Sequence, residues 1–147
     1  MDSLTQRKEL LLKALATLAK SIQLMDKARE RTAFYSVIFD SKKDLEHTLH
    51  DSMLQSFKYT VYTFFDVIKN HLREHDGKLV VRSPKRIFGR MVRAGLLDEK
   101  EAARACEMLA TCKLYLETYS EEVAGHIGDN VKEYYTLMIM MVERIKV

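Results

Sequence analysis

Apolar residues recur along this chain three and four positions apart, the spacing of an α-helix, rather than at the two-residue spacing of a strand. The first stripe comprises Leu11, Leu15, Leu18, Ile22 and Met25, and the second comprises Leu49, Met53, Phe57, Val61, Phe64, Ile68 and Leu72. Alternating steps of four and three, as in the first stripe, are typical of a helix that packs along a long partner. The pattern predicts two long helices, the second from about Asp44 to about His75.

Turn and capping residues predict further helices. Asp76-Gly77 ends the second helix. Ser83-Pro84 is typical of an N-cap followed by proline at the first helical position, and it opens a short helix that ends near Ala94-Gly95. Asp98 is a suitable N-cap for the next helix. The buried face of that helix is predicted to comprise Ala105, Leu109, Cys112 and Leu116.

The last helix has the most regular stripe, which comprises Ala124, Ile127, Val131, Tyr134, Met138, Met141 and Ile145. Apolar residues also stand between these positions, namely Leu137, Ile139, Met140 and Val142. Because the helix is apolar nearly all round, we expect one of its surfaces to bury against a second copy. The sequence therefore predicts an all-α protein, an up-and-down helical bundle of four main helices plus a short helix, that forms a homodimer. Residues 27 to 43 fit either a loop or a partial helix.

Length and composition narrow the class of protein. The 147 residues fit a single domain, residues 1–147, with one hydrophobic core. The N-terminal stretch interleaves charge with leucine, unlike a secretory signal. The longest apolar run, at 137–142, is far shorter than the roughly 20 residues of a membrane span. Cys106 and Cys112 would lie roughly 9 Å apart on one helix, beyond disulfide reach. We expect a cytoplasmic protein that does not enter a membrane.

Positive charge is concentrated between residues 77 and 97, a segment without an acidic residue. Its basic residues are Lys78, Arg82, Lys85, Arg86, Arg90 and Arg93. Helical spacing places Arg86, Arg90 and Arg93 on one face. The opposite face, expected to pack, holds Ile87, Met91 and Ala94. The arginine row and the helix N-terminus at Ser83 suit an anion such as a nucleotide, an RNA backbone or an acidic protein surface. The alternative is a solvated basic face without a ligand.

Histidines offer a weak match to a metal site. The segment from His71 to His75, HLREH, fits an inverted zinc-peptidase pattern, with the two imidazoles one turn apart. No third ligand is evident, and histidine near a helix C-terminus is also favoured by the helix dipole. The other histidines, His47, His50 and His126, suggest a metal even less. We expect no metal and no cofactor.

The stretch MLATCKLYLETYSEE, residues 108–122, holds the candidate chemistry. Cys112 falls on the apolar stripe, so its default role is that of a small buried hydrophobe, and no base is near in sequence to activate it. Lys113 and Glu117 are four positions apart and would form a surface ion pair. Tyr119 follows at the end of the helix. From the residues alone, this stretch is as consistent with bundle packing as with a site.

From about Leu54 onward, the chain resembles the HEPN-type bundle proteins known as nucleotidyltransferase substrate-binding proteins. The matching segments are QSFKYTVYTFFDVIKNHL, SPKRIFGRMVRAGLLDE and MLATCKLYLETYSEEVA. The last resembles the signature "Met-Leu-Glu-Asp-Arg-Asn, three residues, His-Thr-Tyr-Asn-Glu-Glu" and retains Met108, Leu109, Thr118, Tyr119, Glu121, Glu122 and Ala124. The resemblance implies a partnership with a minimal nucleotidyltransferase, often as a toxin and antitoxin module.

The chain departs from this family where the chemistry is expected. In active HEPN proteins, the signature Arg and His are implied to cleave RNA without a metal, but Cys112 and Glu117 stand there. Lys113 replaces the signature Asn, and Lys58 replaces the acid of the second helix. Cysteine lacks the guanidinium fork that grips phosphate, and a carboxylate at 117 repels an RNA backbone. The resemblance therefore implies the scaffold of a site without its reactive groups.

The expected function is that of a non-catalytic accessory or substrate-binding subunit of a minimal nucleotidyltransferase, with no DNA partner. A groove beside Cys112, Lys113, Glu117 and Tyr119 is the candidate site for a nucleotide or acceptor substrate. The row of Arg86, Arg90 and Arg93 is the candidate contact for an anion or the partner. Two alternatives stay open. One is a HEPN-type ribonuclease or toxin with a site rebuilt around Lys113, Glu117 and Tyr119, with or without Cys112. The other is an antitoxin or interaction module without a ligand.

Overall fold

The structure is a computed structural model that describes residues 4–30, 42–76 and 83–145. These residues form helices and no strands, in the order α1 (Leu4–Glu30), α3 (Lys42–Asp76), α4 (Pro84–Arg93), α5 (Glu99–Thr118) and α6 (Glu121–Arg144). The predicted all-α fold, with four main helices and a short one, is confirmed. Of the segment left undecided, residues 27–30 belong to α1 and 42–43 to α3, and the rest lies outside the described residues.

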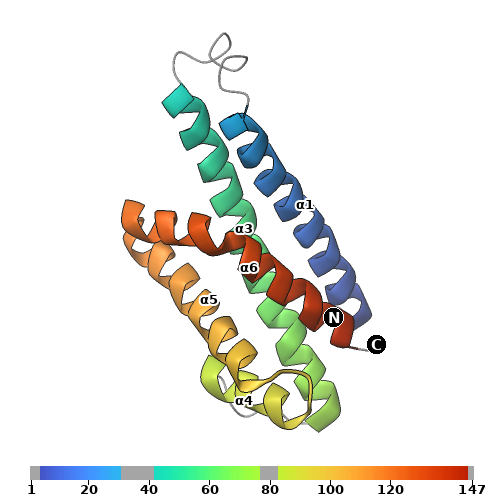
Figure 1. The fold of residues 1–147 in the computed structure, drawn as a ribbon. Coiled ribbons are helices and arrows are strands. Elements are labelled where there is room, and N and C mark those ends of the chain that lie inside the picture. Colours follow the sequence, from blue (N-terminus) through green and yellow to red (C-terminus); the bar gives the residue numbers. More distant parts are fainter. Residues whose placement is uncertain (1–3, 31–41, 77–82, 146–147) are drawn as a thin grey trace.

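The four long helices run alternately up and down the bundle, as Figure 1 shows. α1 and α3 pack along each other, α5 and α6 form a second pair, and the short α4 sits where α3 ends and α5 begins. A side-chain contact fastens the start of α1 to the end of α6, because Lys8 Nζ donates to the carbonyl oxygen of Ile145 at 2.8 Å. None of the helices in the described ranges is long and apolar enough to cross a membrane.

The predicted stripes form the core. All five residues of the first stripe are buried, as are all of the second except Leu49, which is half-buried. Small and hydroxyl side chains let α1 and α3 approach closely, since Thr60 Oγ1 lies 3.3 Å from the carbonyl oxygen of Ala14. Phe57 stacks on Tyr134 of α6 with ring centroids 5.8 Å apart. The first contact joins α3 to α1, and the second joins α3 to α6.

Local capping explains where the shorter helices begin and end. Asp98 accepts a hydrogen bond from the Glu101 backbone at 2.7 Å, and the Glu101 carboxylate accepts one from the Asp98 backbone at 3.0 Å, which is a capping box. Ser83 is the N-cap of α4 with proline following it, as predicted, although its side chain makes no capping bond. Gly95, at φ 77°, ends that segment in the left-handed region that favours glycine. These helix ends could be predicted from the sequence because the residues that cause them lie within a few positions of each end.

The structure differs from the sequence prediction in the packing face of α4 and in the surroundings of α6. Ala94 was expected on the packing face of α4, but it is the exposed C-cap, because the helix ends at Arg93. Phe88 is fully buried instead and stacks on Phe64. The apolar residues thought to surround α6 for a second copy are partly used within the chain, since Leu137 and Val142 are buried. α6 contacts α1, α3 and α5, so most of its sides face protein already.

Candidate functional site

The C-terminal half of α5 lies against the middle of α3, and this contact collects several of the groups singled out in the sequence. The pKa of Tyr62 on α3 is raised by burial and then by the nearby Cys112 and Glu117 of α5. Lys58, one turn before Tyr62, acts on Cys112 from the same side. Lys58, Tyr62, Cys112 and Glu117 therefore share one local environment, formed where α3 meets α5.

The thiol of Cys112 is expected to be unreactive in this environment. Its side chain is only 2 % exposed. Burial raises the pKa of the thiol to about 11, and the positive charge of Lys58 opposes this only in part. A thiol with so high a pKa stays protonated at neutral pH, so it neither attacks a substrate nor pairs with phosphate. The predicted burial of Cys112 on the apolar stripe is confirmed.

The other residues of the predicted groove are exposed around the end of α5. Tyr119 is 69 % exposed and adopts the left-handed backbone conformation, with φ of 49°, as the C-cap of the helix. Its ring lies 5.6 Å from that of Tyr115. Lys113 and Glu117 are also exposed, but within the described residues no ion pair joins them, so the pair expected from their spacing is absent. Glu117 lies close enough to Tyr62 for its charge to raise the pKa of that tyrosine.

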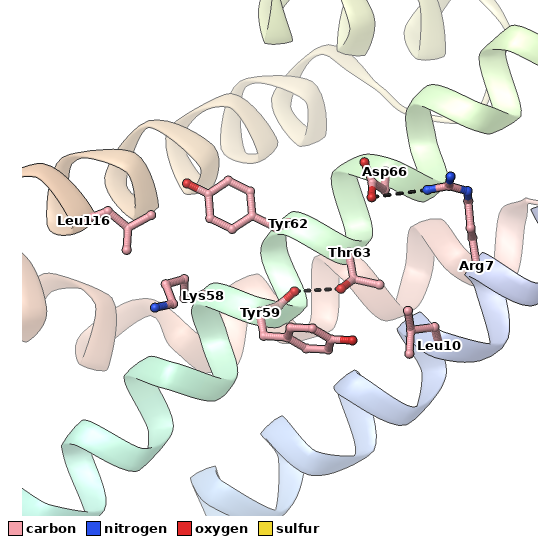
Figure 2. Close-up of a pocket in the computed structure, with 8 residues that line it drawn as sticks. All are labelled: Arg7, Leu10, Lys58, Tyr59, Tyr62, Thr63, Asp66 and Leu116. Carbon is pink, nitrogen blue, oxygen red and sulfur yellow. Dashed lines mark hydrogen bonds and ion pairs between the residues drawn. The ribbon is translucent and has the colours of Figure 1, made fainter. Parts of the chain in front are cut away.

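A hollow of about 560 Å³ opens beside this cluster, between α1, α3 and α5. Figure 2 shows the eight residues that line it, Arg7, Leu10, Lys58, Tyr59, Tyr62, Thr63, Asp66 and Leu116. Arg7 of α1 and Asp66 of α3 form an ion pair at 3.3 Å across one end. Lys58 lies toward the other end, beside Leu116 (Figure 2). The hollow thus runs from a paired arginine to a lysine without a carboxylate partner among the described residues.

The lining of the hollow suits a ligand that is both flat and anionic. Tyr59 and Tyr62 are about half exposed and stand three positions apart on α3. Tyrosine rings offer faces on which a planar base can stack, and an exposed lysine attracts phosphate as a point charge. Leu10 and Leu116 supply apolar surface between these groups. The arrangement has the size and lining to hold a nucleotide-like molecule.

The basic helix α4 presents two of its predicted arginines fully and one in part. Arg86 and Arg93 are exposed, and Arg90 is half-buried. Two other basic residues of the segment, Lys78 and Arg82, lie outside the described residues. The opposite side of the helix keeps its apolar side chains in the core, as predicted for Ile87 and Met91, so Arg86 and Arg93 face outward while the helix stays packed. The row is separate from the hollow beside Lys58.

The histidines are dispersed. His71 is 6 % exposed on α3, and the side chain of His75 lies outside the described residues, so the HLREH pair cannot be placed. His47 pairs with Asp51 at 3.4 Å, and His126 pairs with Glu107 at 3.5 Å. No group of three or more histidine, cysteine or acidic side chains is arranged to hold a metal within the described ranges.

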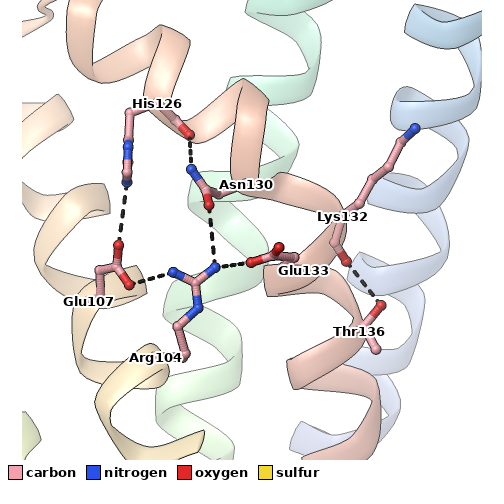
Figure 3. A network of polar contacts seen from close by, with 7 residues as sticks. All are labelled: Arg104, Glu107, His126, Asn130, Lys132, Glu133 and Thr136. Carbon is pink, nitrogen blue, oxygen red and sulfur yellow. Dashed lines mark hydrogen bonds and ion pairs between the residues drawn. The ribbon is translucent and has the colours of Figure 1, made fainter. Parts of the chain in front are cut away.

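A second polar cluster joins α5 to α6, as shown in Figure 3. Arg104 pairs with Glu107 at 2.6 Å and with Glu133, and it donates to Asn130 Oδ1 at 3.3 Å. Its guanidinium also lies 5.1 Å above the ring of the buried Tyr134. Every acceptor of Arg104 belongs to α5 or α6, so we assign the cluster to helix packing rather than to chemistry.

Sequence reasoning missed the aromatic part of the hollow. Tyr59 and Tyr62 fall off the apolar stripe of α3, and this was the available signal, because an aromatic residue outside the buried stripe is exposed. Arg7 and Asp66 could not be paired from sequence, since 59 positions separate them. Lys58 was noted only as a departure from the family pattern. In the structure its charge acts on the thiol of Cys112.

Comparison with known proteins relates the whole chain to one family. A sequence profile of proteins described as "nucleotidyltransferase substrate binding protein like" matches residues 6–147. Among solved structures, a crystal structure of a protein from Thermus thermophilus aligns with a TM-score of 0.69 and 28% sequence identity. The alignment covers 93% of this chain and 99% of that one. No curated protein matches.

Proposed function

The chain belongs to the nucleotidyltransferase substrate-binding protein-like family, and from this premise we propose that it is the accessory, substrate-binding subunit of a minimal nucleotidyltransferase. In this proposal it is a HEPN-type protein, one half of a toxin–antitoxin type module, and it contributes binding rather than catalysis. The nucleotidyltransferase supplies the transfer chemistry.

One observation carries the proposal. The hollow between α1, α3 and α5 lies beside Cys112 and Glu117, the positions at which the HEPN-like signature would place reactive groups. It offers tyrosine faces and Lys58, which suit the base and the phosphates of a nucleotide. Tyr119 and Lys113 stand exposed on the same end of α5 and are candidate contacts for the acceptor substrate. The arrangement favours holding a substrate.

The groups at the signature positions support a role without catalysis. Cys112 remains a neutral thiol because burial raises its pKa to about 11. Glu117 is exposed and brings negative charge to the place where an RNA backbone would lie. The alternative, a ribonuclease or toxin with a rebuilt site, requires Lys113, Glu117 and Tyr119 to act together. Lys113 makes no contact with the other two in the described part of the chain, which favours the accessory role.

The homodimer is proposed on a different surface from the one the sequence suggested. Leu10, Tyr59 and Tyr62 are large apolar or aromatic side chains, each 43 to 51 % exposed, and all three border the hollow. On α6, by contrast, Ile139 and Met140 are partly buried against the chain's own core. A second copy packed on the α1–α3 face beside the hollow would cover side chains that are more exposed than Ile139 and Met140.

Two assays test the proposal. The tagged chain is purified from its own host, and a nucleotidyltransferase is expected to co-purify and to lose transfer rate when the chain is removed. The purified chain is then incubated with structured and single-stranded RNA, and no cleavage is expected. Failure to recover a nucleotidyltransferase would contradict the accessory role. Cleavage that disappears in Glu117→Gln would replace it with the ribonuclease alternative.

A further inference from the structure

A second hollow, of about 590 Å³, lies between α4 and α5 on a part of the molecule that the proposed substrate site does not use. Small and apolar residues from both helices line most of it, namely Gly89, Val92, Ala102, Ala103 and Cys106. Three charged side chains complete the lining. Two of them, Lys85 and Arg93, are basic and belong to α4, and Glu99 begins α5. We call this the α4–α5 groove.

Gly89 keeps the α4–α5 groove open, and the chain's own packing does not require a glycine there. The residue stands in the middle of α4, where glycine is a poor helix former. A Cβ added at Gly89 would meet no atom within 4 Å. Gly128 offers a contrast, since a Cβ there would come within 2.8 Å of His50 Nε2. The space above Gly89 is therefore unfilled by the chain itself and available to another molecule.

The α4 side of the α4–α5 groove is basic, and Glu99 of α5 is the single acidic residue of the lining. α4 carries Lys85, Arg86, Arg90 and Arg93 and no acidic residue. Within the described part of the chain, neither Lys85 nor Arg93 forms an ion pair. Lys85 also acts on the half-buried thiol of Cys106, whose pKa is raised chiefly by burial, so its charge reaches the lining of the groove. A negatively charged occupant would be attracted to both ends of α4.

We propose that the α4–α5 groove is a docking site for a helix of a partner protein, one whose contact face carries small and apolar residues flanked by carboxylates. The groove is bounded by two helices, and the lack of a side chain at Gly89 lets a third helix approach closely. Burial of apolar surface against Val92, Ala102 and Ala103 stabilises the bound helix. Lys85 and Arg93 favour a partner helix that carries carboxylates beside its apolar face. Nothing in this proposal depends on what the hollow beside Lys58 binds.

Titration with a designed peptide tests the proposal directly. The probe is a helical peptide of about 20 residues, long enough for about 30 Å of helix, with alanine and leucine on one face and glutamate beside them. A control peptide has lysine in place of every glutamate. The glutamate peptide is expected to shift the amide NMR signals of Gly89, Ala102, Ala103 and Cys106 in a saturable manner, more weakly at high salt, and the lysine peptide is expected not to shift them.

Two glycine-to-leucine variants, one in the groove and one on α6 as its control, test whether binding needs the open space at Gly89. Gly89→Leu fills the α4–α5 groove and is expected to weaken binding of the glutamate peptide at least tenfold while keeping the melting temperature. Gly125→Leu makes the same change on α6, where a Cβ also meets no atom within 4 Å, and binding should be unaffected. The double variant Lys85→Glu with Arg93→Glu should reverse the preference toward the lysine peptide.

Three results would overturn the proposal. They are equal binding of the two peptides, undiminished binding to Gly89→Leu, and no saturable shift with the glutamate peptide. Decanoate, a small anionic amphiphile, is titrated as a further probe. If decanoate saturates these signals and the glutamate peptide does not, the α4–α5 groove holds a small ligand rather than a partner helix.

Discussion

Lys58 acts on the thiol of Cys112 across the contact between α3 and α5, yet burial of the thiol has the larger effect and raises its pKa to about 11. The resemblance found in the sequence implies an acid and an arginine at these two positions. The structure instead places a cation beside a buried, neutral thiol. Cysteine offers no guanidinium for a phosphate, whereas Lys58 lines the neighbouring hollow.

The first prediction concerns thiol reactivity. In the folded protein at pH 7.5, iodoacetamide should modify Cys112 far more slowly than a free thiol, because roughly 0.03 % of a thiol with so high a pKa is ionised. Mass spectrometry of the Cys106→Ser variant follows Cys112 alone, and urea-unfolded protein gives the reference rate. Rapid modification of Cys112 without unfolding would contradict the assigned environment.

The same burial predicts a pH dependence of stability. The pKa of Cys112 is raised in the folded state from 9.0 to about 11, so folding favours the neutral thiol. This contribution is fully present below pH 9 and is lost as the pH rises to 11. Between these values, wild type should lose about 2–3 kcal/mol more unfolding free energy than Cys112→Ala. Urea titrations of both proteins at several pH values measure the difference, and parallel curves would refute it. Tyrosines that titrate in this range are common to both proteins.

The third prediction concerns two glycines of α6. Gly125→Ala should stabilise the chain by about 0.5–1 kcal/mol, because alanine is the better helix former and the added Cβ meets open space. Gly128→Ala should fall short of that gain by about 1 kcal/mol, because its Cβ would come within 2.8 Å of His50 Nε2. In the His50→Ala background the two substitutions should become equivalent. Thermal and urea unfolding of the four variants measures this, and equal gains in wild type would exclude the close contact.

The fourth prediction concerns the contribution of Arg104 to the stability of the fold. Arg104→Met should lower the unfolding free energy by about 1–2 kcal/mol, because it removes exposed ion pairs to Glu107 and Glu133 and the contact with Tyr134. Lys132→Met, which removes a single exposed pair with Asp26, serves as the control and should cost less than about 0.5 kcal/mol. Urea unfolding gives both values. Equal losses would mean that the cluster does not join α5 to α6.

The fifth prediction concerns the oligomeric state and asks whether the dimer interface lies on the α1–α3 face or on α6. Light scattering of wild type should give the mass of a dimer. Tyr59→Glu, on the α1–α3 face, should give a monomer, because a buried charge would replace apolar contact. Met140→Gln, on the surface of α6 that the sequence suggested, should remain a dimer. A wild-type monomer would refute the dimer, and dissociation in Met140→Gln alone would return the interface to α6.

Much of the fold follows from local rules and was predictable. The stripes of α1 and α3 and the caps at Ser83 and Asp98 depend on residues a few positions apart. The surroundings of α6 were not predictable in this way. Its apolar sides suggest a second subunit when viewed as sequence, but Leu137 and Val142 are buried within the same chain, and Ile139 and Met140 are partly buried. Periodicity reports how much of a helix is buried and does not report which partner buries it.

The candidate site was predictable only in part. The signature positions were found by resemblance, and the structure places Glu117 and Cys112 together. Tyr59 and Arg7 come to the same hollow from different helices, and no spacing rule connects them. The α4–α5 groove was likewise hidden, because α4 and α5 form it jointly. Sites built between helices need the packing as well as the sequence.

Nucleotide binding at the hollow beside Lys58 tests the central claim most directly. Calorimetric titration of ATP, as a probe for nucleoside triphosphates, into the purified chain should give saturable binding without any turnover of the nucleotide. Lys58→Gln and Tyr62→Ala should each weaken that binding about tenfold, which corresponds to about 1.4 kcal/mol. Lys85→Gln, in the α4–α5 groove, should leave it unchanged. No binding to the chain alone or with its nucleotidyltransferase, or equal affinity in Lys58→Gln and wild type, would contradict the account.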